Sequence, residues 1–70
     1  MKFQVMDHTG HSTLEFAEAQ RADAQEKFTT LLAQGKIAGT RKTGERDYRN
    51  IKQFNDAQDE TIFTPHRQGG

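Results

Sequence analysis

The sequence predicts a single small α+β domain in which one helix packs on one face of a sheet. Two N-terminal stretches alternate apolar and polar residues, which is the period of a strand. A central stretch then places apolar residues at helical spacing, and the rest of the chain holds short strand-like runs between polar segments. One helix on a mixed or antiparallel sheet is the economical way to bury both patterns. We expect the domain over residues 1–65 and a flexible tail over residues 66–70.

The first two strands are expected to form a β-hairpin. Residues 2–7 and 11–16 each alternate, and Asp7 and Gly10 between them are typical residues of a tight turn and of a left-handed loop position. The face of the hairpin that should be buried carries four apolar side chains: Phe3, Val5, Leu14 and Phe16.

From Ala17 the period of the apolar residues becomes helical. The apolar stripe of the expected amphipathic helix is Ala24, Phe28, Leu31 and Leu32. Asp23 with Glu26 three residues later resembles a helix start, although the helix could begin as early as Ala19. Gly35 stands where a left-handed residue commonly ends a helix.

Three shorter segments after the helix complete the expected fold. "KIAGTRK" predicts a strand anchored by Ile37. "RDYRNIKQF" resembles another strand, but Tyr48, Ile51 and Phe54 break the period of two, so we expect a bulge or a shorter strand with an irregular piece. "NDAQDE" is a loop or a single helical turn, and "TIFT" is a last strand that Pro65 ends or marks as an edge.

The order of elements resembles the ubiquitin-like β-grasp family. The matching stretches are "KFQVMDHTGHSTLEF" for a hairpin, "ADAQEKFTTLLAQG" for a helix, and "ETIFTPHRQGG" for a last strand with its tail. The resemblance covers the layout of the whole chain, and at residue level it consists of Arg67 and the closing Gly69-Gly70. Pro65 and the long basic stretch from Ile37 to Phe54 depart from ubiquitin, and an all-antiparallel sheet fits nearly as well.

The resemblance implies a small non-enzymatic carrier or modifier. In such proteins an adenylating enzyme activates the terminal glycine carboxylate, which is then passed to a thiol, an amine or a sulfur donor. Gly70 would carry the carboxylate, Gly69 would supply clearance because glycine has no Cβ, and Arg67 would dock on the protein partner. The simpler interpretation is that the two glycines belong to a frayed chain end.

An alternative function is a small interaction module that binds nucleic acid. The segment 36–54 has six basic and two acidic side chains, and acidic segments flank it. Its basic side chains would follow a phosphate backbone while its tyrosine stacks on a base; the residues concerned are Arg41, Lys42, Arg46, Tyr48, Arg49 and Lys52. The overall pI of about 6.8 argues against this, and a solvated hairpin, whose charges also discourage edge pairing, is the simpler explanation of the basic run. A third class is an accessory protein that binds another protein through its sheet edge.

Other functions find little support in the sequence. The chain has no cysteine, which excludes disulfides and thiol catalysis. Asp7, His8 and His11 lie in one turn, with His66 as a fourth candidate ligand for zinc or nickel, but we interpret these histidines as exposed turn residues and predict no metal site. No apolar run approaches the roughly 20 residues of a membrane span. We therefore expect a cytoplasmic protein that is not an enzyme, uses no cofactor and binds no membrane.

Overall fold

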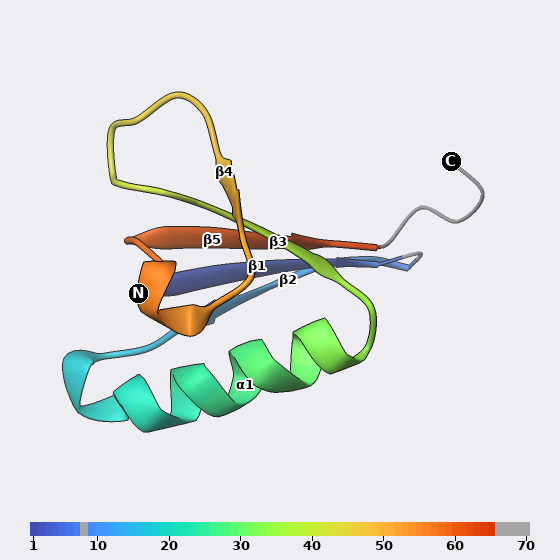
Figure 1. Ribbon diagram of the computed structural model, residues 1–70, viewed down its shortest axis with the longest axis horizontal. Coiled ribbons are helices and arrows are strands. Elements are labelled where there is room, and N and C mark those ends of the chain that lie inside the picture. Colours follow the sequence, from blue (N-terminus) through green and yellow to red (C-terminus); the bar gives the residue numbers. More distant parts are fainter. Residues whose placement is uncertain (8, 66–70) are drawn as a thin grey trace.

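The computed structural model describes residues 1–7 and 9–65, which form one helix and one sheet (Figure 1). Within these residues the strands are β1 (Lys2–Asp7), β2 (Gly10–Glu15), β3 (Ile37–Arg41), β4 (Arg49–Ile51) and β5 (Glu60–Thr64). The helix α1 (Arg21–Ala33) follows the short 3-10 turn η1 (Glu18–Gln20), and a second such turn, η2 (Phe54–Asp56), precedes β5. The predicted α+β class is confirmed.

The five strands make one mixed sheet in the order β2-β1-β5-β3-β4. β1 and β5 run parallel, and the other three pairs of neighbours are antiparallel, so the all-antiparallel alternative is wrong. The strand that comes last in the sequence therefore lies at the centre of the sheet. α1 covers one face, and on the opposite face, which we call the open face, the described part of the chain places no helix (Figure 1).

The predicted hairpin forms, and Asp7 and Gly10 pair where its two strands meet the turn. The carboxylate of Asp7 accepts hydrogen bonds from the backbone N–H and the hydroxyl of Thr9, at 2.8 and 2.7 Å. Gly10 has a φ of 137°, a conformation that favours glycine. The predicted buried face is confirmed with one refinement. Phe3 is fully buried, whereas the other three side chains are half-buried and pack against the core: Val5, Leu14 and Phe16.

The helix starts earlier than the pattern of Asp23 and Glu26 suggests. α1 begins at Arg21 and continues directly from η1, which begins at Glu18, so a start at Asp23 is wrong and the helical segment as a whole agrees with the earlier alternative near Ala19. The side-chain oxygen of Gln20 accepts a hydrogen bond from the backbone N–H of Ala17 at 3.0 Å. This bond supplies a local start signal that does not need Asp23.

The predicted helix end at Gly35 is confirmed. Gly35 has a φ of 91°, its N–H donates to the carbonyl of Leu32 at 3.0 Å, and the N–H of Lys36 donates to that of Leu31 at 3.2 Å. This pair of bonds satisfies carbonyls that the end of the helix would leave free. The predicted apolar stripe packs on the sheet, with Ala24, Phe28 and Leu31 buried and Leu32 half-buried.

The anchor predicted for β3 is wrong. Ile37 is 39% exposed, and the buried residues of the strand are its small ones, Ala38, Gly39 and Thr40. Ile37 pairs with Thr64, and alternation along β3 turns its side chain to the open face. Pairing with β5 thus decides which face each residue takes, and the largest apolar side chain ends on the wrong side for burial.

The stretch "RDYRNIKQF" contains a short strand followed by an irregular piece, which is one of the two alternatives that the sequence predicted. β4 has three residues, Tyr48 precedes it, and Phe54 lies in η2. Phe54 is buried, and its ring centroid lies 5.8 Å from that of Phe28. The break in the period of two therefore marks the point where the chain leaves the sheet edge and turns under it.

All five phenylalanines form one continuous chain of edge-on ring contacts. The successive centroid distances are 5.2 Å for Phe16–Phe3, 5.0 Å for Phe3–Phe63, 5.6 Å for Phe63–Phe28 and 5.8 Å for Phe28–Phe54. Such pairs contribute about 0.5–1.5 kcal/mol each beyond the area that they bury. The core therefore extends without interruption from the hairpin through β5 and α1 to η2.

A buried pair of threonines joins β3 to β5 beside this core. Thr40 and Thr61 face each other in the register, and their hydroxyl oxygens are 3.1 Å apart. The Thr40 hydroxyl donates to the carbonyl of Glu60 at 3.0 Å and accepts the N–H of Gln58 at 2.7 Å. Thr61 then donates to Thr40, so the one proton and both lone pairs of the Thr40 hydroxyl are used.

We expect Thr40→Val to lower the free energy of unfolding by about 1–3 kcal/mol, because the N–H of Gln58 and the hydroxyl of Thr61 both lose their acceptor in a buried site. Thr61→Val is the matched control, because it removes one donor and leaves the two other bonds of Thr40 in place. Urea unfolding of both variants measures the difference. Equal losses would contradict the assignment of Thr40 as the centre of this network.

Candidate functional site

The predicted conjugation residues Arg67, Gly69 and Gly70 lie outside the described residues. The structure shows where the chain leads toward them. β5 ends at Thr64, in the middle of the sheet, and Pro65 is exposed. Thr64 pairs with Ile37 on one side. On its other side the parallel register, which pairs Val5 with Phe63, brings Met6 next to it. We call this end of the sheet the exit end.

The open face changes character from one end of the sheet to the other. The register places four charged residues together at the end away from the exit: Lys2, Glu15, Arg41 and Glu60. At the exit end the open face carries Met6 and Ile37, and Ile62 lies one row further in, opposite Gly39 and Gln4. Ile37 is the one large apolar side chain classed as exposed among the described residues. An apolar surface therefore adjoins the point where β5 ends.

The helix end fixes the position of the exit end. Lys36, the first residue after Gly35, donates from its Nζ to the carbonyl oxygen of Met6 at 3.1 Å. This bond ties the connection between α1 and β3 to the end of β1. β1 and β3, the strands on either side of β5, are therefore joined by this side-chain hydrogen bond as well as by their pairing with β5.

Arg41, predicted to bind phosphate, makes its contacts within the molecule. Its Nε lies 3.5 Å from a carboxylate oxygen of Glu60, and its Nη1 donates to the carbonyl of Glu45 at 3.1 Å. The guanidinium also lies over the ring of Tyr48, 4.6 Å from its centroid. These contacts join β3, β5 and the loop over residues 42–48, so Arg41 organises that loop.

Tyr48, the predicted stacking residue, is half-buried, and Arg41 covers one face of its ring. Its Cβ sits over Gly39, where an added Cβ would be 3.3 Å from it and 3.6 Å from a methyl group of Ile62. Gly39 thus lets Tyr48 lie close to the sheet. At most one ring face of Tyr48 remains for a base.

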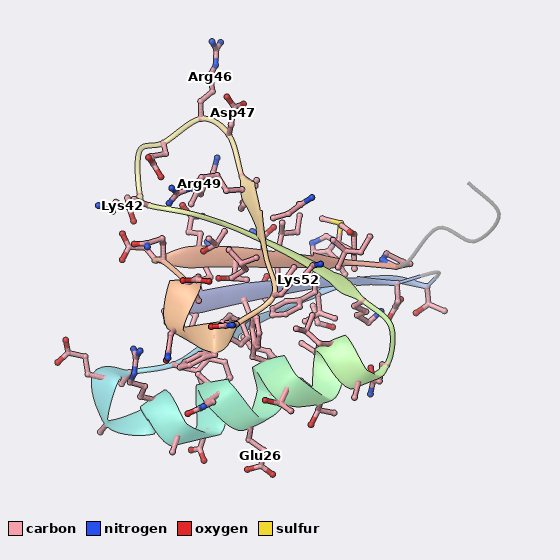
Figure 2. All side chains as sticks on the ribbon, in the orientation of Figure 1. Glu26, Lys42, Arg46, Asp47, Arg49 and Lys52 are labelled. Carbon is pink, nitrogen blue, oxygen red and sulfur yellow. The ribbon has the colours of Figure 1, made fainter. Side chains whose placement is uncertain are left out.

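The four other predicted basic residues are exposed, namely Lys42, Arg46, Arg49 and Lys52. Figure 2 shows that they do not gather in one cluster. Arg46 lies at the tip of the loop beside Asp47, and Lys52 lies at the far end of β4. Acidic groups are used within the same loop: Glu45 accepts the N–H of Lys42 at 2.7 Å, and Asp59 accepts that of Thr43 at 3.1 Å.

The partners of Arg41 and Tyr48 were not among the predicted site residues. Glu60 follows Arg41 by 19 positions, and only the pairing of β3 with β5 brings the two together. Nothing in the sequence indicated that Tyr48 would pack over Gly39. Sequence spacing alone does not contain this information, since it depends on which strands become neighbours.

The described residues contain neither a metal site nor a membrane-spanning helix. His8 and His66 lie outside them, and His11 is exposed on β2. Over residues 1–7 and 9–65 no three histidine, cysteine or acidic side chains are close enough together to hold a metal ion. In the same residues α1 is too short and too polar to cross a membrane.

Comparisons of the chain with protein-family models, with curated proteins and with solved structures find no match.

We expect Arg41→Ala to loosen the loop over residues 42–48, because it removes the contacts to Glu60, Glu45 and Tyr48. Amide hydrogen exchange should become faster at Glu45, whose N–H donates to Lys42 within the loop. Lys42→Ala, which removes an exposed side chain, is the control and should leave exchange at Glu45 unchanged. Equal exchange in Arg41→Ala and the unchanged protein would show that Arg41 does not order the loop.

The nucleic-acid prediction has a quantitative test. If the four exposed basic residues contact phosphates of a single strand, affinity should fall about 50-fold between roughly 50 and 200 mM salt. Replacing all four by glutamine should remove this dependence. Titration of a fluorescent oligonucleotide by anisotropy measures both. A salt-insensitive affinity in the unchanged protein would rule out binding through these four residues.

Proposed function

We propose that this chain is a small ubiquitin-like carrier or modifier that acts through Gly69-Gly70 and is not itself an enzyme. One observation carries the proposal: the tail follows the central strand of the sheet and starts beside the apolar part of the open face. A partner that binds this surface would have the tail within reach. Residues 66–70 extend at most about 17 Å when fully stretched.

The fold supports the proposal. A hairpin, one helix across one face, and a mixed sheet with the first and last strands parallel at its centre are features of a β-grasp domain. The mixed topology also removes the competing all-antiparallel arrangement. Fold alone does not specify function, and the features that favour a carrier are the Gly69-Gly70 tail and the apolar surface beside the end of β5.

The chemistry that we propose begins at the carboxylate of Gly70. A carboxylate is a poor acyl donor, and an adenylating enzyme activates it by attack of a carboxylate oxygen on the α-phosphate of ATP, which releases pyrophosphate. A thiol, amine or sulfur nucleophile then attacks the carbonyl carbon of the mixed anhydride and AMP leaves. Gly69 and Gly70 have no side chains to obstruct a narrow channel, and Arg67 supplies a cation for docking.

The partner surface that we propose is the apolar part of the open face, formed by Met6 and Ile37 at the exit end and by Ile62 in the next row. Ile37 is 39% exposed, which is unusual for an isoleucine and leaves apolar area for a partner to cover. The carrier function is favoured over nucleic-acid binding because Arg41 and Tyr48 already make internal contacts and acidic residues lie among the free cations.

Incubation with ATP and a cell lysate, followed by mass spectrometry, tests the carrier function. We expect an adenylate, thioester or isopeptide adduct at Gly70, and no adduct after deletion of Gly69-Gly70. The intact mass of the natural protein should show a carboxylate that is free at Gly70. The proposal is contradicted if no adduct forms at Gly70 and if deletion of Gly69-Gly70 has no effect in cells.

Ile37→Glu should slow formation of that adduct at least several-fold, because it places a charge in the apolar partner surface while the tail is unchanged. Its effect on stability should be small, because Ile37 is exposed. Gln25→Glu is the matched control, since it adds the same charge on an exposed helix position. If both variants react at the same rate, the partner does not use the exit end.

A further inference from the structure

β2 has a free edge along its whole length. It lies at one end of the sheet order, with β1 as its one neighbour among the described residues. Phe16 and Met1 exchange two backbone bonds just beyond it, at 2.8 and 3.0 Å. Such double bonds recur at every second pair of an antiparallel ladder. The residues between them, His11, Thr13 and Glu15, therefore direct their N–H and C=O groups away from β1.

This edge lacks most of the devices by which proteins block further strand pairing, and apart from His11 the one acidic or basic residue of β2 is Glu15. β2 has six residues, all matched one to one with β1, so it has no bulge, and its sequence GHSTLE contains no lysine or proline. The opposite edge differs. β4 has three residues and carries Arg49, with Lys52 just after it. The two edges are thus unequal, and β2 is the one that is open to another strand.

We propose that β2 pairs with β2 of a second copy of this chain. The two strands run antiparallel about a two-fold axis through Thr13, and two five-stranded sheets become one continuous sheet. Both copies then carry α1 on the same side, because paired residues share a face. The inference is independent of the carrier function, since the exit end lies at β5, with β1 between β5 and β2.

The register of this pairing follows from the outward-facing residues. Hydrogen-bonded pairs require an outward residue opposite an outward residue. A two-fold axis through Thr13 sets Thr13 against Thr13 and His11 against Glu15 of the second copy, so all three outward residues of each strand are used. An axis through Ser12 or Leu14 leaves one of the three without a partner inside β2.

The side chains fit this register. On the open face, an imidazole lies opposite a carboxylate at each end, and histidine can donate a hydrogen bond to carboxylate in either protonation state. Thr13 faces its own copy at the centre, a pairing that is favourable in sheets. On the helix side the half-buried Leu14 lies opposite Ser12 of the second copy, so the two leucines become diagonal neighbours and cover each other's exposed area.

Sedimentation equilibrium over roughly 10 µM to 1 mM tests the pairing, a range set by the weak association expected of a small interface. We expect a monomer that becomes a dimer as concentration rises. Amides of His11, Thr13 and Glu15 should gain protection from hydrogen exchange over the same range. A monomer at every concentration overturns the proposal.

Thr13→Pro should abolish the dimer. It removes an N–H that points away from β1, so the monomer loses no hydrogen bond. His11→Lys should tighten the dimer and His11→Glu should weaken it, each by several-fold, which keeps the test decisive even where the proline variant fails to fold. Asn50→Glu on β4 is the control and should change nothing. Dimerisation that ignores the changes at His11, or that responds to Asn50→Glu instead, also overturns the proposal.

Discussion

The ring contact between Phe3 and Phe63, with centroids 5.0 Å apart, joins the first strand of the chain to the last. Both residues are fully buried. Phe16 packs against Phe3, and Phe28 packs against Phe63 and in turn contacts Phe54. A chain of this length buries only about 60% of its unfolded surface, and the hydrophobic fraction here is 31%. The core therefore depends on a few large rings, each from a different segment, and has few other apolar groups to replace a lost one.

This arrangement also explains where the candidate site lies. Burying Phe63 draws β5 into the centre of the sheet, so the chain beyond Thr64 departs from the best-supported strand. The alternation that turns Phe63 and Thr61 toward α1 turns Ile62 and Thr64 to the open face. The apolar surface at the exit end is thus a by-product of the same register that builds the core.

The sequence predicted those parts of the fold whose signals are local. Gly35 ends the helix because its left-handed conformation depends on one residue, and the hairpin follows from alternation and a turn. Ile37 was misplaced because the pairing of β3 with β5 sets its face, and that pairing joins residues far apart in the chain. Alternation also carries no strand direction, so the parallel placement of β5 was not predictable. The roles of Arg41 and Tyr48 changed for a related reason: Arg41 meets Glu60 only in the folded sheet, and the same guanidinium covers one face of the Tyr48 ring.

The central position of β5 has a consequence for the way this protein is made. The ladder between β1 and β5 joins Lys2 to Glu60, nearly the full length of the chain, and contacts of such separation slow folding because the loop must close before they form. Synthesis starts from the N-terminus, so the hairpin and α1 emerge first, with Phe3 and Phe28 lacking the ring that packs between them. A nascent chain that stalls before Phe63 would expose this apolar surface, and such surface is what makes unfinished chains prone to aggregate and dependent on chaperones.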